Sequence, residues 1–387
     1  MHFTRLELRN WRNFGSVSVP LTPQTFVIGP MASGKTNLLD ALAFLRDIAH
    51  PHGGLARAAT LRGGMANIRS LYAVPAAVVR VVIELDLGSG VRFGYRLDLA
   101  EDRHHRPKVR REVVESAGRV VLQRPDAEDR ADPDRLESTA LEQAASARDF
   151  PDLPAALAMT TAWDPSPAFI RESAPEPGNG DDRTGHTLLA QLVEEKRRSQ
   201  LSFENRWKEV VAELRLAVPG LQDLTIERSG GWTPHLAARF AGWRANASPQ
   251  DERRLSAGTL RLLALLWETH SKGGTLLLES PEQSLHPATI RRLPTILTGM
   301  TRRAGRQAIV ATSSPGGLLR CRHRHRFRAG TGTDARRYPR RRRRRLESHP
   351  CCAGPRRTFA IAARHRAAAA PLRRCRTSGA GEAGEAT

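Results

Sequence analysis

Alternating apolar and polar residues at the start of the chain predict two half-buried strands, at residues 5–9 and 16–21. The short apolar run at 25–28 is typical of a buried central strand. From residue 37 to 48 the apolar residues follow helical spacing instead. The pattern therefore predicts a strand, a glycine-containing loop and a helix, in that order.

The mixture of strands and helices continues as far as residue 312. Residues 78–99 alternate on both sides of a glycine-containing turn, which predicts a hairpin. Residues 100–185 are polar and give only a patchy helical signal, whereas 186–215 give a clear one. The remaining predicted elements are strands at 222–241, a helix at 259–269, a strand at 275–278, a helix at 288–300 and a strand at 307–312.

The pattern stops near position 320, and the composition changes with it. Residues 321–387, called the tail below, hold 19 arginines, no lysine and four acids, so they carry +15 of the net charge of +21 and leave +6 for residues 1–320. All four cysteines also lie in the tail. Residues 1–320 therefore contain no disulfide framework and no thiolate metal site, which favours a reducing, cytoplasmic compartment.

Two interpretations of the tail remain open. It is either a disordered arginine-rich arm that binds phosphates, or the product of a shifted reading frame. The abrupt change just after Pro315, where a strand should continue, favours the shifted frame. We expect no membrane association, because no apolar run approaches the ~18 residues of a membrane span. The N-terminal residues also lack the apolar segment of a secretory signal.

The loop between the first predicted central strand and helix fits the pattern G-x-x-x-x-G-K-[ST], in which glycines let backbone N–H groups surround phosphates. The lysine of this pattern reaches the β- and γ-phosphates, and the hydroxyl binds Mg²⁺. The sequence therefore predicts ATP and Mg²⁺ as ligands. The candidate nucleotide-binding residues in this segment are Gly29, Pro30, Met31, Ala32, Ser33, Gly34, Lys35, Thr36 and Asn37.

Two later motifs carry a resemblance to a known family. Residues 255–261 read L-S-A-G-T-L-R and resemble the signature of ABC-type ATPases, most closely the RecF/OLD/SMC-like branch. Residues 275–287, TLLLESPEQSLHP, resemble the Walker B and D-loop segment of the same branch. The resemblance implies that Glu279 joins Thr36 in the Mg²⁺ shell, and that Ser256 and Gly258 contact the nucleotide of a second copy.

The sequence departs from the family pattern at two positions. The position that usually carries the catalytic glutamate holds Ser280, which cannot act as a general base at neutral pH. The position of the usual switch histidine holds Ser313. Glu279, Ser280 and Glu282 are the candidate catalytic residues, and slow hydrolysis is expected. Arg12 resembles a phosphate or ribose contact of the branch, with a solvated charge at a strand end as the alternative.

The resemblance implies an α/β fold, namely a P-loop NTPase with an ABC-ATPase-like head, a mixed β-sheet and a helical insertion. We expect residues 1–99 and 216–320 to form the two parts of the head and 100–215 to be mainly helical. The P-loop ends at Thr36 and the signature begins at Leu255, a separation too short for long coiled-coil arms. The tail lacks the acidic cluster of a Toprim domain.

The implied function is ATP-dependent homodimerisation with slow hydrolysis, in DNA repair or anti-phage defence. The alternative is a nucleotide-gated scaffold with little or no turnover that controls a partner protein. Either DNA or an effector protein would be the partner, and the sequence names neither.

Overall fold

The structure is a computed structural model. It describes residues 1–74, 77–88, 90–143, 146–172, 183–229, 233–242, 248–271 and 273–314. Within the tail it describes only the backbone of two short strands, β13 (His325–Ala329) and β14 (Phe359–Ala363), which pair in parallel. The rest of the tail lies outside the described residues, so both interpretations of it stay open.

The first large element is a six-stranded antiparallel sheet, in the order β2-β1-β4-β5-β6-β7. Every pair of neighbouring strands in it is antiparallel, and burial alternates along β1 and β4 as the sequence pattern predicts. Its strands are β1 (His2–Trp11), β2 (Phe14–Pro20), β4 (Val79–Asp86), β5 (Arg92–Glu101), β6 (Pro107–Ser116) and β7 (Arg119–Arg124).

The second large element is a four-stranded parallel sheet in the order β3-β12-β11-β8. Its strands are β3 (Gln24–Ile28), β8 (Thr161–Trp163), β11 (Thr275–Glu279) and β12 (Gln307–Thr312). Both faces of this sheet are buried: on β11, Leu277 belongs to one hydrophobic core, whereas Leu276 and Leu278 belong to the other. Burial on both faces explains why these strands are continuous apolar runs in the sequence.

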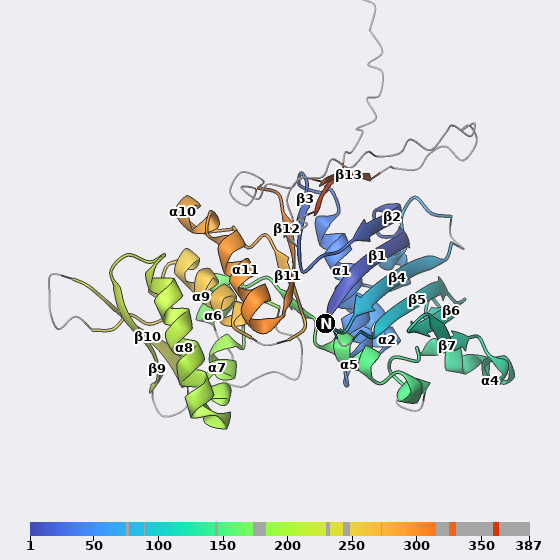
Figure 1. Cartoon of the computed structure of the whole chain (residues 1–387), viewed down its shortest axis with the longest axis horizontal. Helices are drawn as coiled ribbons and strands as arrows, with labels where there is room; N and C mark the ends of the chain where they lie inside the picture. The colour runs from blue at the N-terminus through green and yellow to red at the C-terminus, as the bar shows by residue number, and fades with distance from the viewer. Residues whose placement is uncertain are drawn as a thin grey trace, which may run out of the picture.

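Helix α1 (Lys35–Ala49) fills the space between the two sheets (Figure 1). Its residues from Leu38 to Ile48 are buried almost without interruption, because the helix contacts a sheet on each side. Such burial suits a helix that is hydrophobic around most of its circumference. The N-terminus of α1 is therefore fixed relative to both sheets.

The opposite face of the parallel sheet is covered by helices, and an antiparallel hairpin packs against α7 and α8 (Figure 1). The hairpin strands are β9 (Leu221–Ser229) and β10 (Thr233–Phe240), and the helices are α6 (Pro167–Arg171), α7 (Leu188–Arg198), α8 (Gln200–Arg215), α9 (Ala257–Thr269), α10 (Pro287–Ile290) and α11 (Leu293–Ala304). Short helices elsewhere are α2 (Leu55–Thr60), α3 (Met65–Ile68), α4 (Ala127–Ala131), α5 (Asp152–Ala158) and 3-10 turns at Pro133–Glu137 and Ser146–Asp149.

The expected α/β fold is confirmed, with two differences in detail. The antiparallel and parallel strands form two separate sheets and not one mixed sheet. Residues 100–215 are also not helical throughout, because β6 and β7 extend the antiparallel sheet and β8 joins the parallel one. The longer helices of this segment begin at α7. Among the described helices, none is long and apolar enough to cross a membrane.

Because both faces of the parallel sheet are buried, truncating a side chain of its strands should strongly lower the free energy of unfolding. Leu277 is 2% exposed, and we expect Leu277→Ala to lower the free energy of unfolding by about 2–5 kcal/mol. Leu201→Ala on α8 is the matched control, because this leucine is 73% exposed and its loss should change stability by less than about 0.5 kcal/mol. Urea denaturation measures both. Equal effects of the two substitutions would contradict the buried position of β11.

Candidate nucleotide-binding site

The glycine-containing loop at 29–34 connects β3 to α1, as the motif predicts. Gly34 has a left-handed φ of 91°, and a Cβ on it would lie 2.2 Å from Nδ2 of Asn13. Ala32 also adopts a left-handed φ, of 59°. The left-handed conformation favours glycine at position 34, and a Cβ there would also displace the side chain of Asn13.

The turn between β1 and β2 holds this loop in place. Asn37 Nδ2 donates a hydrogen bond to Asn13 Oδ1 at 2.7 Å, and Trp11 Nε1 donates to the carbonyl oxygen of Asn37 at 2.8 Å. Trp11 is fully buried against α1, at 5.3 Å between its ring and that of Phe44. The N-terminal strand therefore sets the position of the first turn of α1.

Two polar groups of the loop fit a phosphate ligand. Lys35 Nζ donates to the carbonyl oxygens of Gly29 and Pro30 at 3.0 and 2.8 Å, so its ammonium lies over the loop. Burial lowers the pKa of Lys35 from its usual value, and the carboxylates of Glu279 and Glu282 partly offset this effect. Ser33 Oγ is buried and has no hydrogen-bond partner within the described residues. The first N–H groups of α1 add the positive end of the helix dipole.

The hydroxyl and carboxylate expected to hold Mg²⁺ are in contact. Thr36 Oγ1 donates a hydrogen bond to Glu279 Oε1, although the two residues lie 243 positions apart in the sequence. Glu279 ends β11, so both residues are at the carboxyl-end edge of the parallel sheet, where α/β proteins bind ligands. This pair of oxygens suits Mg²⁺, which binds through one or two protein oxygens and the phosphates of its nucleotide.

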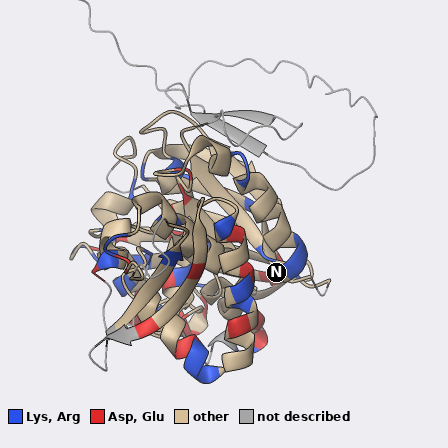
Figure 2. Ribbon diagram, turned by 90° about the vertical axis from the view of Figure 1, so that its left-hand side faces the viewer, with Lys and Arg blue, Asp and Glu red and all other residues tan. Residues whose placement is uncertain are grey.

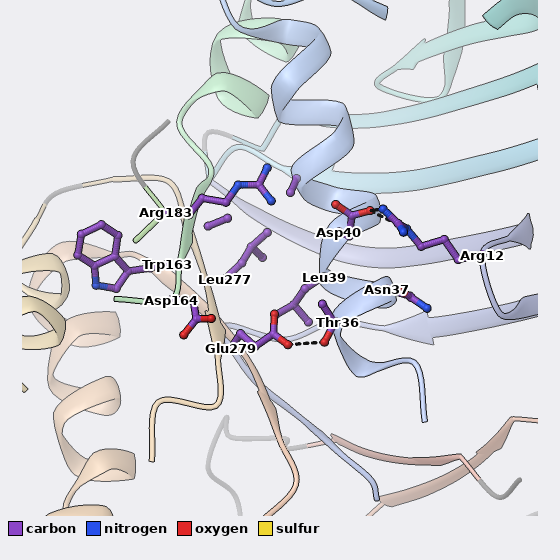
Figure 3. Close-up of a pocket in the computed structure, with 12 residues that line it drawn as sticks. Arg12, Thr36, Asn37, Leu39, Asp40, Trp163, Asp164, Arg183, Leu277 and Glu279 are labelled. Carbon is purple, nitrogen blue, oxygen red and sulfur yellow. Dashed lines mark hydrogen bonds and ion pairs between the residues drawn. The ribbon is translucent and has the colours of Figure 1, made fainter. Parts of the chain in front are cut away.

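A cavity of about 170 Å³ opens beside this pair. Four residues predicted from the sequence line it, namely Arg12, Thr36, Asn37 and Glu279 (Figure 3). The side chain of Arg12 is ion-paired: its Nη2 lies 2.7 Å from Asp40 Oδ2, and Arg62 binds the other oxygen of Asp40 at 2.9 Å. Arg12 is therefore not a freely solvated charge, and its contact with a nucleotide stays a proposal.

The signature residues Ser256 and Gly258 lie at the N-terminal end of α9. Ser256 is the exposed N-cap of α9, and its Oγ accepts a hydrogen bond from the N–H of Thr259 at 3.1 Å. A Cβ on Gly258 would lie 2.5 Å from the carbonyl oxygen of Ser284, so the close approach of the segment after β11 requires glycine there. Neither Ser256 nor Gly258 lines the cavity at Thr36.

The three candidate catalytic positions have different surroundings. Ser280 adopts a left-handed φ of 43°, and its N–H donates to the carbonyl oxygen of Ala311 at 2.8 Å. Glu282 is 8% exposed and accepts a hydrogen bond from Thr312 Oγ1. Ser313 follows Thr312 at the exposed end of β12. The third candidate, Glu279, is the acid in contact with Thr36.

The structure adds residues that the sequence reasoning did not assign. Asp164 and Arg183 line the same cavity (Figure 3), and Arg261 binds Asp164 at 2.6 Å. Strand β8, which carries Asp164 to the site, has only three residues and therefore shows no usable periodicity. Arg261 is the last residue of the signature motif, but the motif alone does not indicate which residue its side chain contacts.

Residues 25–316, about three quarters of the chain, match the profile of a family described as "AAA domain, putative AbiEii toxin, Type IV TA system". The chain belongs to this family. Its fold resembles the crystal structure of an SMC head bound to the C-winged helix domain of ScpA, with a TM-score of 0.52, 17% identity and coverage of 82% of this chain and 91% of that chain. At that identity the likeness shows the fold alone.

A shorter segment of this AAA-domain protein is similar in sequence to RecF proteins. It is 38% identical over 92 residues to the DNA replication and repair protein RecF of Brucella abortus (strain 2308), covering 23% of each chain. The match to RecF of Streptomyces avermitilis is 34% identical over 91 residues, or 23% of this chain and 24% of that one. The matched segment thus spans about a quarter of these relatives. The family match thus identifies an AAA-domain protein with the fold of an SMC head, and the RecF matches agree with the expected RecF/SMC-like branch over about a quarter of the chain.

The geometry of the loop predicts the effect of removing its lysine. Lys35→Ala deletes the ammonium that lies over the loop, so we expect ATP binding to fall below detection in isothermal titration calorimetry. Lys208→Ala on α8 removes an exposed lysine of the same charge and should leave ATP affinity unchanged. If Lys35→Ala binds ATP as the wild type does, the assignment of the loop is wrong.

Proposed function

We propose that the protein binds Mg²⁺–ATP at the cavity, closes as a homodimer around two nucleotides and hydrolyses them slowly. The observation that carries this proposal is the contact between Thr36 and Glu279, which unites the P-loop with the acid that ends β11. In such a complex Lys35 would neutralise phosphate charge, and Mg²⁺ would neutralise the charge that develops on the phosphates. Arg12, held by Asp40, would contact phosphate or ribose from the cavity wall.

The position of Ser256 supports the dimer. The N-terminus of α9 presents the exposed Ser256 and the backbone N–H groups of its first turn, which suit a phosphate. Because Ser256 does not line the cavity of its own chain, the nucleotide that it contacts would belong to a second copy. ATP would then join the two copies, and hydrolysis would separate them.

A second candidate function is a nucleotide-gated scaffold without turnover. Ser280 and Ser313 favour it, because neither can serve as the general base or the histidine switch. An ATP-binding assay beside a phosphate-release assay separates the two functions. Binding without phosphate release under saturating Mg²⁺–ATP would establish the scaffold.

DNA is the partner that we propose for the dimer, in DNA repair or phage defence. The RecF relatives are named for DNA replication and repair, and the family description names a toxin–antitoxin system. Residues 1–320 carry a net charge of only +6, and Figure 2 shows basic and acidic residues mixed over the face it presents. Binding by this part of the chain should therefore be weak and should gain from dimerisation, which doubles the phosphate contacts.

The dimer can be tested with a substitution that keeps the helix cap. Ser256→Asp retains an N-cap acceptor for α9 but sets a negative charge against the partner's γ-phosphate. We expect ATP to convert the wild type from monomer to dimer in analytical ultracentrifugation, whereas Ser256→Asp binds ATP and stays monomeric. Ser199→Asp, at the exposed N-cap of α8, is the control and should dimerise normally. ATP-dependent dimers of Ser256→Asp would contradict the proposed interface.

DNA binding can be separated from the charge of the tail by its dependence on ATP. For the full chain, we expect duplex DNA affinity to rise when ATP is added, on top of a steeply salt-dependent affinity from the arginines. Lys35→Ala keeps the same tail and should lose only the ATP-dependent part. Salt titrations by fluorescence anisotropy, with and without ATP, measure both parts. An identical response to ATP in the two proteins would exclude a nucleotide-gated DNA complex.

A further inference from the structure

We propose that Asp164 supplies the carboxylate that Ser280 lacks, and that it orients the water that attacks the γ-phosphate. This inference rests on the proposed ATP hydrolysis and names the residue on which turnover would depend. Arg261, from the signature helix α9, holds Asp164 in position and is a positioning residue.

The register of the parallel sheet places Asp164 beside Glu279. Strands β8 and β11 pair so that Trp163 lies opposite Leu278, and Asp164 and Glu279 are the residues that come directly after this pair. Neighbouring strands lie about 4.8 Å apart, so the two carboxylates leave the same edge of the sheet side by side. Both line the cavity beside Thr36, and Figure 3 shows them close together.

Asp164 is fixed on two sides. Arg261 Nη2 donates to Asp164 Oδ1 at 2.6 Å, and Arg261 Nη1 donates to the carbonyl oxygen of Pro165 at 2.9 Å. The N–H of Asp164 donates to the carbonyl oxygen of Arg183 at 2.8 Å. A carboxylate held in this way loses little conformational freedom when it binds a water molecule.

One oxygen of Asp164 remains accessible. Its side chain is 52% exposed, and among the described residues Oδ2 has no hydrogen-bond partner. Among the other acids of the cavity, Asp40 binds two arginines through its two oxygens, and Glu279 accepts from Thr36 through Oε1. Glu282, which does not line the cavity, is 8% exposed. Asp164 Oδ2 is therefore an exposed carboxylate oxygen of this cavity that is free to accept a hydrogen bond from a water molecule.

Arg261 also contacts Ser280, which occupies the position that usually carries the catalytic glutamate. Its Nη2 donates to the carbonyl oxygen of Ser280 at 3.3 Å, while the arginine itself is 5% exposed. One guanidinium thus connects the ends of β8 and β11 to the helix that begins after Ser256. A structural change at the γ-phosphate would be transmitted to α9 through this contact.

The chemical step is ordinary hydrolysis. The water oxygen forms a bond to the γ-phosphorus, and the bond from that phosphorus to the β,γ-bridging oxygen breaks, which gives ADP and inorganic phosphate. The proton lost by the water passes to Asp164 Oδ2 and then to solvent.

The test uses Asp164→Asn in the full chain, with Mg²⁺–ATP as substrate. We expect kcat to fall about 100-fold, within the range for loss of a general base, while KM and the ATP dissociation constant change less than about threefold. Asp223→Asn is the control: this aspartate is 51% exposed and pairs with Arg215 on the hairpin side, so its loss should leave kcat unchanged.

Substitutions at Arg261 and Ser280 separate an effect on positioning from an effect on folding. Arg261→Met should lower kcat at unchanged KM, and Arg261→Lys should recover part of the loss by keeping a donor beside Asp164. Ser280→Glu should raise wild-type turnover and should restore turnover to Asp164→Asn, because it returns a carboxylate to position 280.

Four results would overturn the inference. The first is an unchanged kcat in Asp164→Asn, and the second is a loss of ATP affinity in that variant without a loss of kcat. The third is that Glu282→Gln loses turnover whereas Asp164→Asn does not. The fourth is a wild type that binds ATP without releasing phosphate. The last result would leave ATP binding and ATP-dependent dimerisation intact. A wild type that binds no ATP would overturn the proposed function as well.

Discussion

The parallel pairing of β3, β12, β11 and β8 is the constraint on which the site depends. Backbone hydrogen bonds fix the register of these strands, so the residues that follow them emerge at one edge of the sheet. Thr36, Asp164 and Glu279 reach the same cavity for this reason, since they lie far apart in the sequence. Burial on both faces then prevents the sheet from moving relative to α1 or to the helices behind it.

Buried charges fix α1 along its length. Asp40 pairs with Arg12 and Arg62, and two turns further along the helix Asp47 pairs with Arg46 and Arg62. Burial raises the pKa of Asp47, but the surrounding arginines lower it by more, so the pKa lies below its usual value. Removing one partner would leave a buried charge uncompensated, which is costly, so the network specifies a single position for the helix that carries Thr36.

Through Arg261 the signature helix contacts Asp164 in the cavity wall, and its N-terminus lies at the surface proposed for the dimer. Ser256 is exposed at its N-terminus, while Arg261, one turn into the helix, reaches inward to the ends of β8 and β11. The fold thus provides a short physical path from the nucleotide of one copy to the surface proposed to meet the nucleotide of the other. Such a path would couple the two sites without any large rearrangement of the sheets.

The sequence by itself determined the local elements and the chemistry of the loop. Strong periodicity and apolar runs predicted β3, α1, α9, β11 and β12, and the P-loop motif predicted the residues around Lys35, because these features depend on neighbours in the chain. The tertiary structure alone decided that β6 and β7 extend the antiparallel sheet and that Asp164 joins the site. A three-residue strand such as β8 has no periodicity, and its place is set by pairing with β11, which no local pattern can record.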